Sequence, residues 1–174
     1  FLDQWIQTAK TQLSDQATGL LIASYGVDGK PAPSGHCPEG SSIFMAAHML
    51  ELVDSAYARD QYQRARMGLG RSFLGFGYAR EWDKGCVGRA DIDSGPIVPL
   101  LEGSAAASGM AVLGAAVFDD EVYLNQLLSS LEFLAFPTIK DDQLRYQASN
   151  PVGDAVLLYG MVEGPLWKRV MEGL

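Results

Sequence analysis

The chain has 174 residues, of which 48% are hydrophobic, and its formal net charge is −8 at pH 7. This length suits one domain with a substantial core, and the composition is that of a globular protein rather than a disordered one. The acidic balance argues against nucleic-acid binding, which needs clustered Lys and Arg, and no apolar run reaches the roughly 20 residues of a membrane span.

The first residue is Phe1 rather than Met, and it already lies inside a helical pattern. We therefore expect a fragment of a longer protein, in which a targeting or membrane segment would lie upstream. Under that interpretation a periplasmic or membrane-tethered location stays open. Cys37 and Cys86 both fall in loop-like sequence, where a disulfide in an oxidising compartment and two free thiols are equally compatible with the pattern.

Helical periodicity alternates with glycine-rich connections along the first half of the chain. Apolar spacings of three and four predict an amphipathic helix over residues 1–14, followed by a helix-poor stretch over 20–39 whose apolar start also suits a short strand. Ser41 and Ser42 are expected to cap an interior helix, because its apolar residues surround most of the circumference. A third helix, over 56–74, carries its arginines on one face and is therefore expected on the outside.

The second half repeats this order after a long loop over 75–103. An interior helix rich in small residues begins near Ser104 and contains Gly109 and Gly114, each of which costs about 1 kcal/mol relative to Ala. Glycine would therefore be favoured only at crowded positions, where neighbouring helices leave no room for a side chain. An outer helix is expected from Asp119–Asp120 to Pro137, which would end it.

The last part of the chain is expected to hold a loop over 138–149, an interior helix that begins near Pro151, and an outer segment that begins at Pro165. Long connections thus precede every interior helix, whereas short turns follow them. This alternation predicts an all-α domain of stacked antiparallel αα-hairpins, with inner and outer helices and all long loops at one end.

Three of these loop segments carry chemically reactive side chains. The first places His36, Cys37 and Glu39 before the N-terminus of an inner helix, where backbone N–H groups favour anions and lower the pKa of a thiol. Plain capping of the helix by Glu39 and the serines is the simpler alternative.

The second segment contains Arg89, Asp91 and Asp93. Two carboxylates at i and i+2 point the same way if the backbone is extended, and close carboxylates can separate into a protonated acid and a charged base. An Asp-rich turn that satisfies its own backbone is the structural alternative.

The third segment holds Tyr146 as a proton donor or stacking group, and Asp154 in the first turn of an inner helix. Capping by Ser149 or Asn150 explains this segment equally simply. No pair of residues has the spacing of a metal site, so we predict neither a metal nor a cofactor, and His48 is interpreted as a hydrogen-bonded core histidine.

Four short motifs extend over most of the chain: residues 15–25 with Asp-Gln-Ala-Thr-Gly-Leu-Leu, Pro38–Ser42, Asp91–Pro96, and Gly-Asp-Ala-Val-Leu from Gly153. They resemble the catalytic-type domain of linalool dehydratase/isomerase-like proteins and, more broadly, the six-hairpin (α/α)6 toroids that include many glycoside hydrolases. The resemblance implies that loops before inner helices line a central cavity and that Asp91, Asp93 and Glu39 face it. About three and a half hairpins fit the chain, which would make it a partial toroid.

Two classes of function follow from these patterns. In the first, an enzyme cleaves a glycoside or dehydrates a hydroxylated substrate. Asp91 and Asp93 are then acid and base, and Glu39, His36 and Tyr146 support them. In the second, a non-catalytic helical-repeat domain binds a glycan or a protein through its loop end. Loop aromatics such as Trp82 and Tyr146 would suit sugar stacking there, although they also suit a hydrophobic core. The pattern leaves the oligomeric state open.

Overall fold

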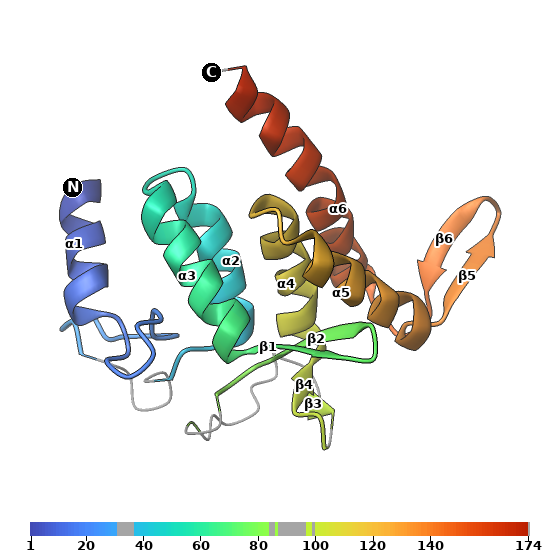
Figure 1. The fold of residues 1–174 in the computed structure, drawn as a ribbon, viewed down its shortest axis with the longest axis horizontal. Coiled ribbons are helices and arrows are strands. Elements are labelled where there is room, and N and C mark those ends of the chain that lie inside the picture. Colours follow the sequence, from blue (N-terminus) through green and yellow to red (C-terminus); the bar gives the residue numbers. More distant parts are fainter. Residues whose placement is uncertain (31–36, 84–85, 87–96, 99, 174) are drawn as a thin grey trace.

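The computed structural model describes residues 1–30, 37–83, 86, 97–98 and 100–173. Within these residues it contains six helices and two antiparallel sheets, so the prediction of an all-α chain is wrong and the fold is mixed α/β (Figure 1). The helices are α1 (Leu2–Gln12), α2 (Gly40–Leu50), α3 (Ser55–Gly68), α4 (Ala105–Val117), α5 (Glu121–Leu134) and α6 (Pro151–Glu172).

The helices form two layers, with α2, α4 and α6 in one and α3 and α5 in the other. The prediction that α2 and α6 are interior helices is wrong for one face of each, because Met49 and Val152 are 49% and 73% exposed. Inner helix α4 packs against both α2 and α6, while α3 packs against α2 and α5 against α4 (Figure 1). The core is centred on α4, where residues 111–115 are all buried, together with Phe44 of α2 and Tyr62 of α3. Small side chains on α4 permit this close approach of helix backbones.

A four-stranded sheet replaces part of the predicted third helix and second loop. Its order is β1 (Gly70–Phe73), β2 (Phe76–Arg80), β4 (Gly103–Ser104) and β3 (Ile97–Val98), with all neighbours antiparallel. Leu74 and Gly75, with φ of 48° and 86°, form the turn between β1 and β2. Two consecutive residues of positive φ match the twist of a hairpin, so the chain turns back here instead of continuing as a helix.

Helix α5 holds the hairpin in place. The Tyr123 hydroxyl donates to the Tyr78 carbonyl at 2.7 Å. A Cβ on Gly77 would lie 2.9 Å from the Leu127 backbone nitrogen, so only glycine lets the strand approach the helix so closely. Tertiary packing therefore supports a hairpin that would be marginal in isolation.

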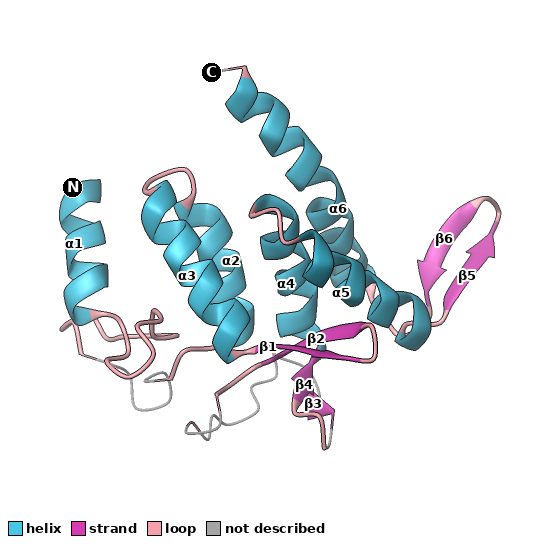
Figure 2. Ribbon diagram, in the orientation of Figure 1, coloured by secondary structure: helices cyan, strands magenta, loops and turns pink. Residues whose placement is uncertain are grey.

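A second hairpin, β5 (Pro137–Lys140) and β6 (Gln143–Tyr146), occupies most of the loop predicted over 138–149 and projects from the helices (Figure 2). Its turn residues Asp141 and Asp142 have φ of 53° and 57°, again the conformation of a two-residue hairpin turn. Pro137, which was expected to end a helix, instead begins β5, and α5 ends at Leu134.

The prediction of a separate outer segment from Pro165 is also wrong, because α6 is one helix from Pro151 to Glu172. Proline lacks one N–H donor and disfavours a helix interior by about 3 kcal/mol, but its fixed φ is helical, so a long helix can continue through it. The C-terminal half of α6 extends beyond the other helices (Figure 1).

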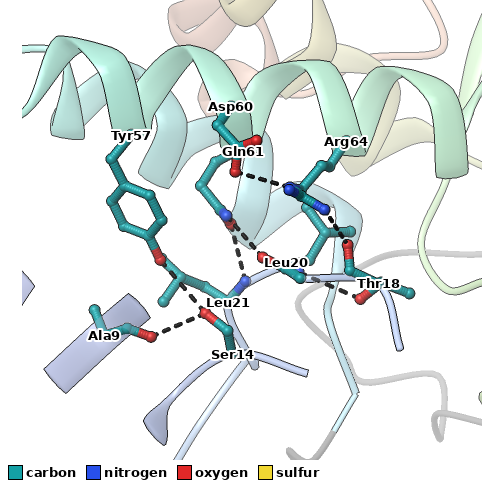
Figure 3. A network of polar contacts seen from close by, with 10 residues as sticks. Ala9, Ser14, Thr18, Leu20, Leu21, Tyr57, Asp60, Gln61 and Arg64 are labelled. Carbon is teal, nitrogen blue, oxygen red and sulfur yellow. Dashed lines mark hydrogen bonds and ion pairs between the residues drawn. The ribbon is translucent and has the colours of Figure 1, made fainter. Parts of the chain in front are cut away.

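Polar contacts join the connection after α1 to the outer helix α3 (Figure 3). The Gln61 side chain accepts from the Leu21 amide at 2.9 Å and donates to the Gly19 carbonyl at 2.8 Å. Arg64 donates to the Thr18 carbonyl at 3.2 Å and to Asp60 at 2.7 Å. These bonds fix the start of the first long connection against the body of the domain.

Candidate functional site

All three inner helices begin at the same end of the domain, as the alternation of long and short connections predicts (Figure 1). We call this the loop end. Helix α4 lies between α2 and α6, so Glu39 before α2 and Asp154 in α6 belong to opposite sides of it (Figure 1).

Glu81 is the central carboxylate of the loop end. Its side chain is fully buried, and Oε1 accepts from the Ser41 backbone N–H at 3.0 Å and from the Ser41 hydroxyl at 2.6 Å. Oε2 accepts from the hydroxyl of Ser104, the N-cap of α4, and the Glu81 carbonyl accepts from the Gly40 N–H at 2.7 Å. One residue thus joins the N-termini of α2 and α4, where the helix dipoles favour a negative charge.

Glu39 is the N-cap residue of α2, and its carboxylate accepts from the Ser42 hydroxyl at 2.5 Å. The expectation that Ser41 and Ser42 cap this helix is wrong, because both lie in its first turn. Ser41 binds Glu81 and Ser42 binds Glu39, so the two serines orient two carboxylates instead.

Cys37 and Cys86 form a disulfide, with 6.1 Å between their Cα atoms. Cys37 is buried three residues before α2. The bond therefore holds Cys86 beside the start of α2 and removes the possibility that either sulfur acts as a thiolate in this state.

His36, Arg89, Asp91 and Asp93 lie outside the described residues. Their described chain neighbours are fixed at the loop end: Cys86 by the disulfide next to α2, and Ile97 by pairing with Ser104 at the start of α4.

Arg80 and Trp82 flank Glu81. Arg80 is 9% exposed, and its Nη2 contacts a Glu102 carboxylate oxygen at 2.8 Å. Its Nε and Nη1 are buried and have no hydrogen-bond partner. Trp82 is half-buried, so its ring is only partly open to a ligand.

Tyr146 and Asp154 are near one another on the α6 side of α4. Burial raises the pKa of Tyr146, and the negative charges of Glu132 and Asp154 raise it further. The phenol is therefore protonated at neutral pH and can donate a hydrogen bond. Among the described residues, Oδ1 of Asp154 is buried and lacks a hydrogen-bond partner.

A small pocket of about 200 Å³ adjoins the disulfide at Pro38. Its walls come from the first connection, the end of α3 and the segment after β2: Thr18, Leu20, Pro38, Arg64, Met67, Gly68, Leu69 and Asp83. Drug-sized ligands occupy cavities of roughly 300–1,000 Å³. This pocket is smaller, and its Arg64 guanidinium is already bonded to Asp60 and Thr18.

His48 is a buried, hydrogen-bonded histidine, as expected from its place in an inner helix. Its Nε2 lies 2.8 Å from the hydroxyl of Tyr159 on α6, and the two rings meet edge to face. Burial lowers the pKa of His48, while the charges of Glu163 and Glu51 raise it by less. The imidazole is therefore neutral at pH 7 and links α2 to α6.

Sequence reasoning missed Glu81 and the His48–Tyr159 contact. Glu81 falls in a predicted loop, and nothing in a single sequence distinguishes a fully buried carboxylate from a solvated one. The partners of both residues are 23 to 111 positions away, so only the tertiary fold brings them together.

No protein-family model and no curated protein matches this chain. The resemblance to linalool dehydratase/isomerase-like proteins and to (α/α)6 toroids therefore stays a prediction from short motifs. In the described part of the chain, no helix has the length and apolar character needed to cross a membrane. In that same part, no three His, Cys, Asp or Glu side chains gather as metal ligands would.

Proposed function

We propose that this domain is an enzyme that carries out general acid/base chemistry on a neutral hydroxylated substrate at its loop end, by glycoside cleavage or dehydration. One observation carries the proposal. Cys86 and Ile97, the described residues on either side of Asp91 and Asp93, are held at the N-termini of α2 and α4, next to Glu39 and Glu81.

In this proposal, Asp91 and Asp93 exchange protons with the substrate. A protonated carboxyl donates to the leaving oxygen, and the charged partner removes a proton or activates water. Glu39 is the third carboxylate near the site, and its bond to Ser42 fixes its orientation. His36 and Arg89 are proposed to bind the substrate or to hold one aspartate charged.

Glu81 has a positioning role. Its oxygens are occupied by Ser41 and Ser104, so it is not an available acid or base. It sets the spacing between the two helix N-termini beside which the reaction would occur. The buried Arg80 lies next to Glu81 in the chain and is paired with Glu102.

The test is turnover of two substrate panels, aryl glycosides and tertiary or allylic alcohols, with products identified by mass spectrometry. We expect one panel to be converted. Asp93→Asn and Asp91→Asn should each lower kcat at least a hundredfold, because general acid/base groups contribute about 10²–10⁴ in rate. The melting temperature should stay near that of the unmodified protein.

Asp141→Asn in the β5–β6 turn is the matched control, since it removes one exposed carboxylate far along the chain from this segment. It should leave kcat unchanged. If neither panel is converted, or if both aspartate variants retain full activity, the proposed function is wrong.

A further inference from the structure

The inner helix layer has one uncovered apolar face. Helices α3 and α5 cover the other side of this layer. The uncovered face, here the inner face, consists of large side chains that are 41–73% exposed: Met45 and Met49 of α2, Leu52 in the turn after it, and Val152, Tyr159 and Val162 of α6. The His48–Tyr159 hydrogen bond shows that the two helices meet on this side.

The α4 helix between these side chains presents only small residues. Ala105, Gly109 and Ala116 are at least partly exposed, and a Cβ on Gly109 would meet nothing within 4 Å. Bulky apolar side chains on the two flanking helices and open space at Gly109 are the shape into which an amphipathic helix packs. Methionine side chains adapt readily to such a partner.

Charge identifies the chemistry of the partner. Helices α2 and α4, and α6 as far as Glu163, contain no Lys or Arg. Carboxylates lie near one end of the face: the charges of Glu51, which follows α2, and Glu163 of α6 both raise the pKa of His48, which is bonded to Tyr159 there. Within the part of the chain that the structure describes, Oε2 of Glu51 is buried without a hydrogen-bond partner, and the whole chain carries a charge of −8.

We propose that the inner face binds a basic amphipathic helix, with apolar residues packed against the exposed side chains of α2 and α6 and Lys or Arg near one end against Glu51 and Glu163. A helix of the length of α2, 11 residues or about 16 Å, spans the face. A second copy of this chain fits poorly, because two acidic faces would repel each other. This inference is independent of the proposed catalytic activity.

The probe is a fluorescein-labelled 14-residue helical peptide with Leu at helical spacings of three and four and Lys in its first and last turns. Fluorescence anisotropy at 150 mM salt should show saturable binding in a 1:1 ratio. The twin peptide with Glu in place of Lys should not bind. Met49→Gln should weaken binding at least tenfold, whereas Ile139→Gln, at an equally apolar but 78% exposed site on β5, should change it less than twofold.

Charge is tested with a matched pair of double variants. Glu51→Gln with Glu163→Gln should weaken binding at least tenfold and reduce its salt dependence. Asp141→Asn with Asp142→Asn removes the same charge from the β5–β6 turn and should have less than a twofold effect. The proposal is overturned by absence of binding, by equal losses in the two pairs, or by a concentration-dependent dimer that Met49→Gln dissociates in light scattering.

Discussion

Glu81 illustrates what a single buried residue contributes to this domain. Three hydrogen-bond donors from the start of α2 and the N-cap of α4 converge on its carboxyl group, and a buried polar group costs free energy unless it is bonded in this way. The residue joins α2 to α4, so it acts as a structural link at the place where we propose the chemistry.

Replacing this carboxylate should therefore destabilise the fold. Glu81→Ala leaves the Ser41 N–H and two serine hydroxyls without their acceptor, and we expect a loss of about 3 kcal/mol in the free energy of unfolding. Glu81→Gln keeps one acceptor and should lose less. Urea unfolding followed by circular dichroism measures both. The exposed Glu172→Gln is the control, with an expected change within about 0.5 kcal/mol. Equal stability of Glu81→Ala and the control would contradict this role.

At the scale of single elements, α4 combines two glycines with different surroundings. Both were expected at crowded positions. That expectation is confirmed for Gly114, where a Cβ would lie 3.0 Å from the ring of Tyr62, and it is wrong for Gly109, which faces open space. Tyr62 cannot move away easily, because it stacks on Phe118 and donates to Asp120.

These two glycines make a matched pair of substitutions in one helix. Gly109→Ala should stabilise the protein by about 0.5–1 kcal/mol, because alanine restricts the unfolded chain and favours helix. Gly114→Ala should destabilise it by about 1–3 kcal/mol, because the added methyl group overpacks the core against Tyr62. Chemical denaturation of the two variants gives opposite signs if the packing is as described. The same sign in both would show that the helix environment is different.

For the whole molecule, the disulfide is the covalent constraint with the longest reach. It closes a loop between residues 49 positions apart and ties the strand region to the start of α2. The loss of chain entropy in the unfolded state predicts that closing such a loop stabilises the fold by roughly 4 kcal/mol. The stabilisation measured for disulfides in other proteins is typically about 2–4 kcal/mol.

Reduction should therefore lower the stability of the domain by a similar amount. We expect the urea midpoint of the protein in dithiothreitol to shift to that of the double variant Cys37→Ser, Cys86→Ser. The double variant itself should not respond to dithiothreitol. An unchanged midpoint of the native protein on reduction would mean that the two sulfurs are not bonded.

The sequence by itself determined the helices whose apolar residues recur at fixed spacing and the end from which the long connections emerge. These features depend on local periodicity and on connection length, which a single chain displays directly. The sequence also predicted α2 and α6 to be interior helices, whereas each exposes one apolar face. Apolar periodicity also predicted a helix through residues 70–74, and this prediction was wrong. Periodicity does not detect a turn at Leu74–Gly75 or the contacts by which α5 supports β2.

Only the tertiary structure decided the sheets, the disulfide, the role of Glu81 and the contact of His48 with Tyr159. The disulfide, the contacts of Glu81 and His48 and the pairing of β2 with β4 depend on partners at least 23 positions apart, and a sequence pattern contains no information on which distant groups meet. The β1–β2 and β5–β6 hairpins pair residues that are close in the chain, but such hairpins need packing against the rest of the fold. The same reason applies to Ser41 and Ser42 at the start of α2. Their position in the sequence is typical of helix caps, whereas in the fold they bind Glu81 and Glu39. Burial and long-range hydrogen bonding, rather than local propensity, set these outcomes.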